Sequence, residues 1–447
     1  MAALAAAMGL SLSAAAAAAD GPYSLALDDP DNPFDAPIPA YIGADGLGIS
    51  PIEDALLEPP LLDPDSRNFL NPIFFGWATD WEDYHRSDNG TQFNWEDDAL
   101  GPATGDSWAV VSLGDLTAEE VDRGDEPGRI TLLFERPIAN LPGADFAVFE
   151  NGFISEENQG GAGIGGIFAE LAYVEVSSDG ATFARFPSVS LTPESVGPFG
   201  SINPTHVFNL VGKHVNSGRK SWGTPFDLED LAADPLVLSG AVDLSAITHI
   251  RIVDIPGTGQ FTDSLGNPIF DAHPTFGSGG FDLEAIGAIS MPVTFAEWEM
   301  IKGVPPALRG AHADASANGL ANLLEAVLAR DPLTPEHGPA TTLHFHPGES
   351  VAPGLSFSRD TRLADVVLEV QAATASMSDW LPAARAVGNA PLEIMPPFSA
   401  TLEDESASEI HSIGVIRNIR LLDVTGHPNG DVRFLRLKVE AIPENEL

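Results

Sequence analysis

Short apolar runs recur along residues 107–289, and Gly, Asp, Asn or Pro bounds each of them. The clearest run is "DFAVFE" at 145–150, in which Phe146 and Val148 alternate with Ala147 and Phe149 as in a β-strand. Many short strands separated by turn residues are typical of β-sandwiches and jelly rolls. We therefore expect a mainly β fold with a jelly-roll β-sandwich over 71–291. The other runs lie at 107–114, 129–135, 171–180, 248–255 and 279–289.

The pattern changes near residue 293. Phe295, Trp298 and Ile301 lie at helical spacing, and a second helical pattern begins at Leu320 and ends at Pro332. Strand-like runs return after about 341. The sequence therefore predicts a short helical linker over 292–338, followed by a second, smaller β-sandwich over 339–447.

The N-terminal region has two further parts. Residues 1–19 carry no charged side chain and end in an Ala run, which is typical of a secretory signal peptide. Residues 20–70 are rich in Asp and Pro, which predicts an irregular arm on the surface. No later run approaches the roughly 20 apolar residues of a membrane span, so we expect no direct membrane insertion. The expected location is secreted, periplasmic or at the cell surface.

The charge balance limits the partners of this chain. It has 21 Lys and Arg against 65 Asp and Glu, a net charge of −44. A polyanion binder needs a cationic surface, so this balance argues against nucleic acid. The chain has no cysteine, which excludes disulfides, thiol nucleophiles and zinc–thiolate sites. Carboxylates in such excess suit an exported protein or one neutralised in part by divalent cations.

The stretch "DASANGLANLLE" at 314–325 has the spacing of an EF-hand loop. Asp314, Ser316 and Asn318 occupy positions 1, 3 and 5, Gly319 occupies the sharp bend, and Glu325 closes the loop at position 12. Ser and Asn stand where two Asp are expected, which weakens calcium binding. We expect a degenerate, structural Ca²⁺ loop. The alternative is a loop held by hydrogen bonds alone.

Three segments carry a family resemblance. "YVEVSSDGATFARFP" (173–187), "AITHIRIVDI" (246–255) and "GFDLEAIGAI" (280–289) resemble the galactose-binding-like (discoidin-type) jelly roll. The longer run 74–289 resembles bacterial exported or cell-surface proteins of unknown function, and this implies no established activity. The 314–325 loop is similar to the calcium-loop module of secreted bacterial proteins. That resemblance implies bound Ca²⁺ and a small β domain after it.

Acidic side chains at strand ends suggest a second place for calcium. Glu150 and Asn151 lie where one strand enters a loop, Asp282 lies in the last strand-like run at 279–289, and hard oxygen ligands of this kind suit Ca²⁺. The alternative is that these side chains hydrogen-bond to turns. Other carboxylates that could contribute lie in the Gly/Pro-rich loop 254–280: Asp254, Asp263 and Asp271.

Aromatic residues suggest a ligand. Trp77, Trp81 and Trp95 lie close in sequence to Asp and Asn, a combination that suits sugar stacking, although core packing is the alternative. The function expected from these features is a non-enzymatic, exported or cell-surface binding protein for a glycan or another surface ligand. Two alternatives remain open. One is an accessory surface protein of TonB-dependent nutrient uptake, with cobalamin as one cargo, and the other is a polysaccharide-active enzyme.

Overall fold

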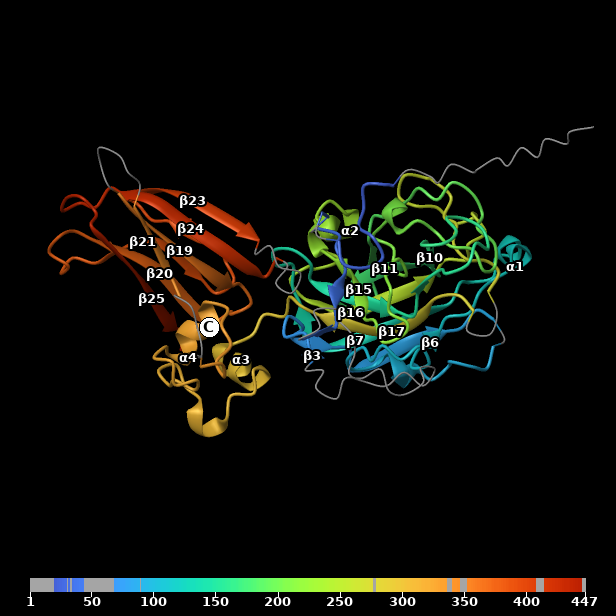
Figure 1. Ribbon diagram of the computed structural model, residues 1–447, viewed down its shortest axis with the longest axis horizontal. Coiled ribbons are helices and arrows are strands. Elements are labelled where there is room, and N and C mark those ends of the chain that lie inside the picture. The colour runs from blue at the N-terminus through green and yellow to red at the C-terminus, as the bar shows by residue number, and fades with distance from the viewer. Residues whose placement is uncertain are drawn as a thin grey trace, which may run out of the picture.

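The computed structural model is mainly β, with several antiparallel sheets. Figure 1 shows the sheets in two groups, a larger N-terminal part in blue to yellow and a smaller C-terminal part in orange to red. The signal peptide expected over 1–19 and the arm segment 44–67 lie outside the described residues. The structure describes residues 20–29, 31–32, 34–43, 68–88, 90–275, 279–335, 340–345, 352–406 and 414–443.

Two sheets make up the larger part. The first has the order β1-β15-β8-β17-β4, and β6 also pairs with β17. The second has the order β12-β11-β16-β7-β5. The strands of the first are β1 (Ile38–Pro39), β15 (Trp222–Phe226), β8 (Phe146–Glu150), β17 (Asp282–Ala288), β4 (Gly76–Trp77) and β6 (Val111–Ser112). Those of the second are β12 (Ala184–Arg185), β11 (Ala172–Ser177), β16 (Ile247–Asp254), β7 (Arg129–Ile138) and β5 (Asp80–His85).

Strand alternation explains how these two sheets pack together. Phe146 and Val148 of β8 share one buried core with Val174 of β11 and Ile252 of β16, so the sheets lie face to face. The opposite side of β8 is also buried, because Phe149 packs in a second cluster with Ile38 of the N-terminal arm. A strand covered on both sides is apolar throughout, as the "FAVF" run is.

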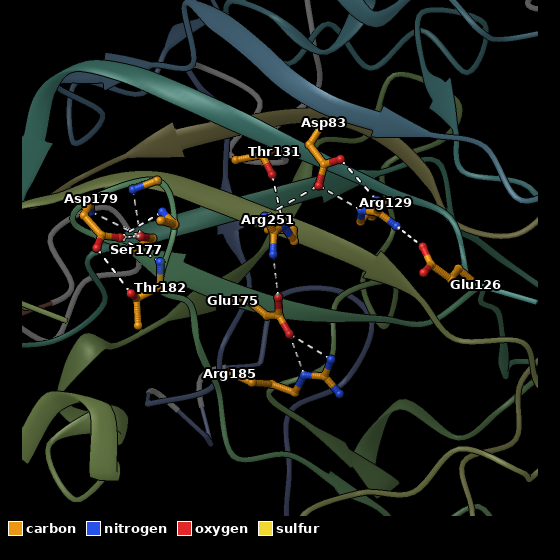
Figure 2. Close-up of polar contacts among 12 residues, drawn as sticks. Asp83, Glu126, Arg129, Thr131, Glu175, Ser177, Asp179, Thr182, Arg185 and Arg251 are labelled. Carbon is orange, nitrogen blue, oxygen red and sulfur yellow. Dashed lines mark hydrogen bonds and ion pairs between the residues drawn. The ribbon is translucent and has the colours of Figure 1, made fainter. Parts of the chain in front are cut away.

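The outer face of the second sheet is charged rather than apolar. Figure 2 shows Arg251 between Asp83 and Glu175, with nitrogen–oxygen distances of 3.6 Å to each. Arg129 and Arg185 extend this row at 2.8 Å from Asp83 and Glu175. These side chains are partly exposed to solvent, so each ion pair contributes little stability. The row makes this face of the sheet polar.

The N-terminal arm differs from the expected irregular surface segment. Its β1 adds an edge strand beside β15 with the register Ile38↔Gly223, and its β2 (Tyr41–Ile42) pairs with β3 (Phe69–Leu70). Lys213 and Asp35 form an ion pair of 2.9 Å in which both side chains are buried. The described residues of the arm are therefore an integral layer of the larger part.

Helices are few and short among the described residues. They are α1 (Ala118–Arg123), α2 (Pro235–Leu238), α3 (Phe295–Ile301) and α4 (Asn322–Val327). The last two confirm the helical patterns near 295–301 and 320–331. Thr294 begins α3 with a capping box: its side chain accepts from the Glu297 amide, and Glu297 accepts from the Thr294 amide at 2.8 Å. Minor strand pairs are β9 (Phe153–Ile154) with β10 (Ile167–Phe168) and β13 (Val189–Ser190) with β14 (Val207–Phe208).

The C-terminal part has two four-stranded sheets, of order β18-β19-β24-β23 and β22-β21-β20-β25. The side chains of Leu355, Val370 and Ile419 share a buried core between the sheets. The strands of the first sheet are β18 (Thr342–Phe345), β19 (Pro353–Asp360), β24 (Ile416–Thr425) and β23 (Ser399–Ser406). Those of the second are β22 (Glu393–Ile394), β21 (Leu381–Val387), β20 (Val366–Ala373) and β25 (Phe434–Ala441).

Arg362 joins the C-terminal part to the larger part. Its guanidinium pairs with Asp360 at 2.8 Å, donates to the carbonyl of Ile73 at 2.7 Å and lies 3.5 Å from the centre of the Phe75 ring. The carbonyl of Arg362 also accepts from the Val293 amide at 2.9 Å. These buried contacts connect the two parts of the protein directly.

Candidate functional site

Buried carboxylates lie at both ends of β8, and they have different surroundings. At its start, Asp145 accepts hydrogen bonds from the amides of Leu141 at 3.0 Å and Leu228 at 2.7 Å. Both of its oxygens thus bind loop backbone, so Asp145 is an architectural residue. At the other end, Glu150 faces a group of further carboxylates.

That group, which we call the acidic end, lies where strands of both sheets of the larger part begin or finish. In the first sheet Glu150 ends β8 and pairs in register with Leu283, next to Asp282 at the start of β17. In the second sheet Asp254 ends β16 opposite Ala172, and Glu170 precedes Ala172 by two residues. The carboxylates of the acidic end are those of Asp115, Glu150, Glu170, Asp254, Asp271 and Asp282.

Backbone hydrogen bonds hold these carboxylates in place. The Phe281 amide donates to Oδ1 of Asp254 at 2.8 Å, and this bond connects the two sheets. The Leu171 amide donates to Oδ2 of Asp271 at 2.6 Å. The backbone approach is close, because a Cβ on Gly280 (φ +69°) would lie 2.3 Å from the carbonyl oxygen of Gly114. Only glycine fits there without distortion.

Burial, and then the charges of neighbouring carboxylates, raise the pKa values of four side chains of the acidic end. Burial raises the pKa of Glu170 well above its ordinary value, and the nearby charges of Asp282, Glu150 and Asp271 raise it further. For Asp254 burial is again the first cause of a strongly raised pKa, followed by the charge of Asp115. Glu150 and Asp271 show the same direction with burial first. In the ionised state these side chains therefore repel one another strongly.

Buried oxygens without a hydrogen-bond partner occur on Asp254 and Glu170 of the acidic end. They are Oδ2 of Asp254, a residue that is 1% exposed, and Oε1 of Glu170, a residue that is 4% exposed. Buried acceptors of this kind are rare, because each loses its hydration without replacement. The other acidic groups are better satisfied: His273 lies 3.1 Å from Asp115, and Asn151 donates to Asp282 at 3.1 Å.

The carboxylates do not yet surround a single point. In the described ranges, no group of three His, Asp or Glu side chains has an arrangement that holds a metal ion as it stands. A cation at the acidic end therefore requires these side chains to turn toward it.

Two further acidic residues, the predicted Asp263 and also Glu284, lie outside the acidic end. Asp263 accepts from the amides of Ser190 and Leu265, both at 2.9 Å, so it stabilises its own turn. Glu284 accepts from the amides of Thr104 at 2.6 Å and Gly105 at 2.5 Å, and burial raises its pKa to about 8. Conversely, the sequence prediction missed Glu170 and Asp115. Their only local signal is an acidic side chain next to a strand end.

The 314–325 loop brings its predicted side chains together. Asn318 donates through Nδ2 to Glu325 at 2.7 Å, and the Ser316 hydroxyl lies 3.3 Å from the same Glu325 oxygen. Asp314 accepts from the amide of Gly319 at 2.8 Å. Asp314, Ser316, Asn318 and Glu325 thus converge as their spacing predicts, although these contacts alone also satisfy the hydrogen-bond alternative.

The predicted tryptophans do not share one surface environment. Trp77 is partly buried and packs against Phe74 and Phe149, with ring centres 4.8 and 5.7 Å away. Trp81 is half-buried and donates to Asp97 at 3.0 Å. Trp95 is 74% exposed.

A different aromatic pair combines the exposed ring of Trp108 with the partly buried ring of Phe93. Trp108 is 48% exposed, and its ring centre lies 5.3 Å from that of Phe93, with 31° between the ring planes. Phe93 has a left-handed backbone with φ of 56°, a strained conformation for a bulky residue. Next to this pair, the hydroxyls of Ser107 and Ser217 lie 2.7 Å apart. The result is a platform of two rings with polar groups beside it.

Within the residues that the structure describes, no helix has the length and apolar character needed to cross a membrane. Comparisons with family models, with curated proteins and with solved structures gave no match.

Proposed function

We propose that this protein is an exported or cell-surface binding protein, without catalytic activity, that recognises a glycan and contains structural calcium. The larger part is a galactose-binding-like jelly roll in this proposal, and the ligand binds beside the Phe93–Trp108 pair. Support comes from the two face-to-face antiparallel sheets, which give loops a rigid base.

The observation that carries the proposal is the exposed aromatic platform. A sugar ring stacks its C–H face on an aromatic ring, while its hydroxyls need polar partners nearby. Trp108 and Phe93 offer such a face, and the hydroxyls of Ser107 and Ser217 lie next to it. We therefore place the ligand at Trp108 and not at Trp77, whose ring packs against Phe74 and Phe149.

Calcium in the 314–325 loop has an architectural role in this proposal. Glu325 lies in α4, and Asn322 of the same helix donates to Glu299 of α3 at 2.9 Å. Helix α4 also packs against the C-terminal sheets through Val327. An ion shared by Asp314 and Glu325 would stabilise this segment between the two parts of the chain.

Burial favours an architectural role for the acidic end as well. Glycoside hydrolysis needs two carboxylates that reach the bond to be cleaved. Glu150, Asp254 and Asp282 are each 1% exposed, so a polysaccharide chain has no access to them in this conformation. This argument favours binding over cleavage.

A glycan array tests the proposal. The chain is applied in CaCl₂ and again with EDTA, together with Trp108→Ala and the control Leu238→Ala, which removes another exposed apolar side chain (73% exposed). We expect binding to a subset of glycans that Trp108→Ala weakens about tenfold, the loss of roughly one stacking contact. Leu238→Ala should bind normally. An empty array, or a glycan shortened by the protein, would refute the proposed function.

A further inference from the structure

We propose that the acidic end binds one calcium ion, with Asp254 and Glu170 from one sheet and Asp282 from the other as carboxylate ligands. This site is distinct from the 314–325 loop and does not depend on a glycan ligand. Its role is to join the two sheets of the larger part at the end where β8 and β16 finish.

Unsatisfied oxygens are the first argument. Oδ2 of Asp254 and Oε1 of Glu170 are buried without a hydrogen-bond partner, while Oδ1 of Asp254 is held by the Phe281 amide at 2.8 Å. Asp254 thus has one oxygen bound to the backbone and one that can bind a further ligand, and Glu170 interacts with the Thr275 side chain while its Oε1 has no partner. A cation satisfies both orphan oxygens at once.

The second argument is charge. Six buried carboxylates lie together, and the described cations beside them are already paired: His273 with Asp115 at 3.1 Å and Arg86 with Asp88 at 2.5 Å. Arg86 does interact electrostatically with Asp282, but one guanidinium does not balance the group. Buried negative charges need a counter-charge or protons, and a divalent cation supplies two charges at one point.

The ligand chemistry selects calcium. The side chains available are carboxylates from strand ends and neighbouring segments, and the His273 imidazole is turned to Asp115. Calcium takes about six to eight oxygens in flexible geometry, whereas magnesium needs a compact octahedron and keeps its water. Ligands from Glu170, Asp254 and Asp282 come from separate segments, which suits the larger and more tolerant ion.

Calorimetry with CaCl₂ alone on the chelator-treated full chain tests this proposal. Asp254→Asn combined with Glu170→Gln should abolish one Ca²⁺ binding event per chain. Asp145→Asn is the matched control, because it alters a buried carboxylate at the opposite end of the same strand β8. It should lower stability and leave the number of bound ions unchanged.

Glu325→Gln separates this site from the 314–325 loop. This variant should still bind one Ca²⁺, retained in excess Mg²⁺, and should still melt at a higher temperature in Ca²⁺ than in EDTA. The Glu325→Gln measurement also tests the proposal if the double variant fails to fold. Unchanged Ca²⁺ binding by the folded double variant, or no Ca²⁺ binding by Glu325→Gln, would overturn the proposal. In that event the acidic end carries protons in place of an ion.

Discussion

The amide of Phe281 donates a 2.8 Å hydrogen bond to the carboxylate of Asp254. Phe281 directly precedes β17 of the first sheet, and Asp254 ends β16 of the facing sheet. The second oxygen of Asp254 is left without a hydrogen-bond partner. Asp254 therefore connects the two sheets of the larger part through one oxygen and belongs to the acidic end through the other.

The close backbone approach beside this contact should be intolerant of any side chain. Gly280→Ala places a Cβ 2.3 Å from the carbonyl oxygen of Gly114 and 2.8 Å from Oδ1 of Asp254, at a left-handed φ of 69°. We expect a loss of about 2 kcal/mol or more in the free energy of unfolding, measured by urea denaturation. Gly266→Ala is the control, since it has a positive φ of 85° and open space around its Cβ. It should lose only about 1 kcal/mol.

Arg362 should contribute strongly to stability. Arg362→Ala removes the ion pair with Asp360, the bond to Ile73 and the contact with Phe75, and it leaves the Asp360 carboxylate buried without its partner. Removing one member of a buried pair costs about 3–5 kcal/mol. Thermal or urea denaturation measures this loss. Arg433→Ala, whose pair with Asp431 is exposed, should change stability by less than about 1 kcal/mol. Equal losses of stability in the two variants would mean that the buried Arg362 contacts stabilise the protein no more than an exposed ion pair does.

The N-terminal arm should detach when its buried ion pair is broken. Lys213→Met leaves Asp35 buried as an unpaired carboxylate, although Ser24 still donates its amide to Asp35 at 2.8 Å. Limited proteolysis with mass spectrometry should then show faster cleavage within residues 20–43. Adding Asp35→Asn to Lys213→Met removes the unpaired buried charge and should restore part of the protection against proteolysis. Cleavage at the wild-type rate in Lys213→Met would show that packing alone holds the arm.

Asp227 should make the protein less stable as pH rises through 6. Burial raises its pKa to about 6, above the roughly 3.9 of an unfolded chain, so the folded state holds this proton more tightly. The resulting stabilisation is complete below about pH 4 and disappears as pH rises through 6. Asp227→Asn should therefore gain about 1–2 kcal/mol relative to wild type at pH 7 and nothing at pH 4, allowing for partial exposure.

Urea midpoints of Asp227→Asn and wild type between pH 4 and 7 measure this difference. Asp243→Asn is the opposite case: hydrogen bonds from Ser245 lower the pKa of Asp243, so its variant should show no gain at neutral pH. A pH-independent difference between Asp227→Asn and wild type would contradict the assignment.

Local pattern predicted the elements well and their partners poorly. The runs at 129–135, 171–180 and 248–255 are found as β7, β11 and β16, because alternation and turn residues are local properties. The run at 107–114 contains only the two-residue β6, since much of that segment forms turns around Asp106. The 314–325 loop was predictable for the same reason: its spacing lies within one short segment.

Long-range pairing was not predictable in this way. Asp145 and Glu150 lie at the two ends of one strand and look alike in sequence. Both accept from loop amides, yet only Glu150, which binds the Gly152 amide at 2.6 Å, also faces the carboxylates of Asp282 and Glu284. Glu170 meets Asp282 only because β11 and β17 belong to facing sheets whose ends coincide. The N-terminal arm likewise reads as irregular, and its β1 exists because β15 offers a free edge.

The most direct test of the account is a crystal structure of the full chain grown in CaCl₂, with anomalous scattering used to locate calcium. The account predicts an anomalous peak at the acidic end within about 2.3–2.6 Å of carboxylate oxygens of Asp254 and Glu170. Ordered water or direct carboxyl–carboxyl hydrogen bonds at that position, with no anomalous signal, would contradict it.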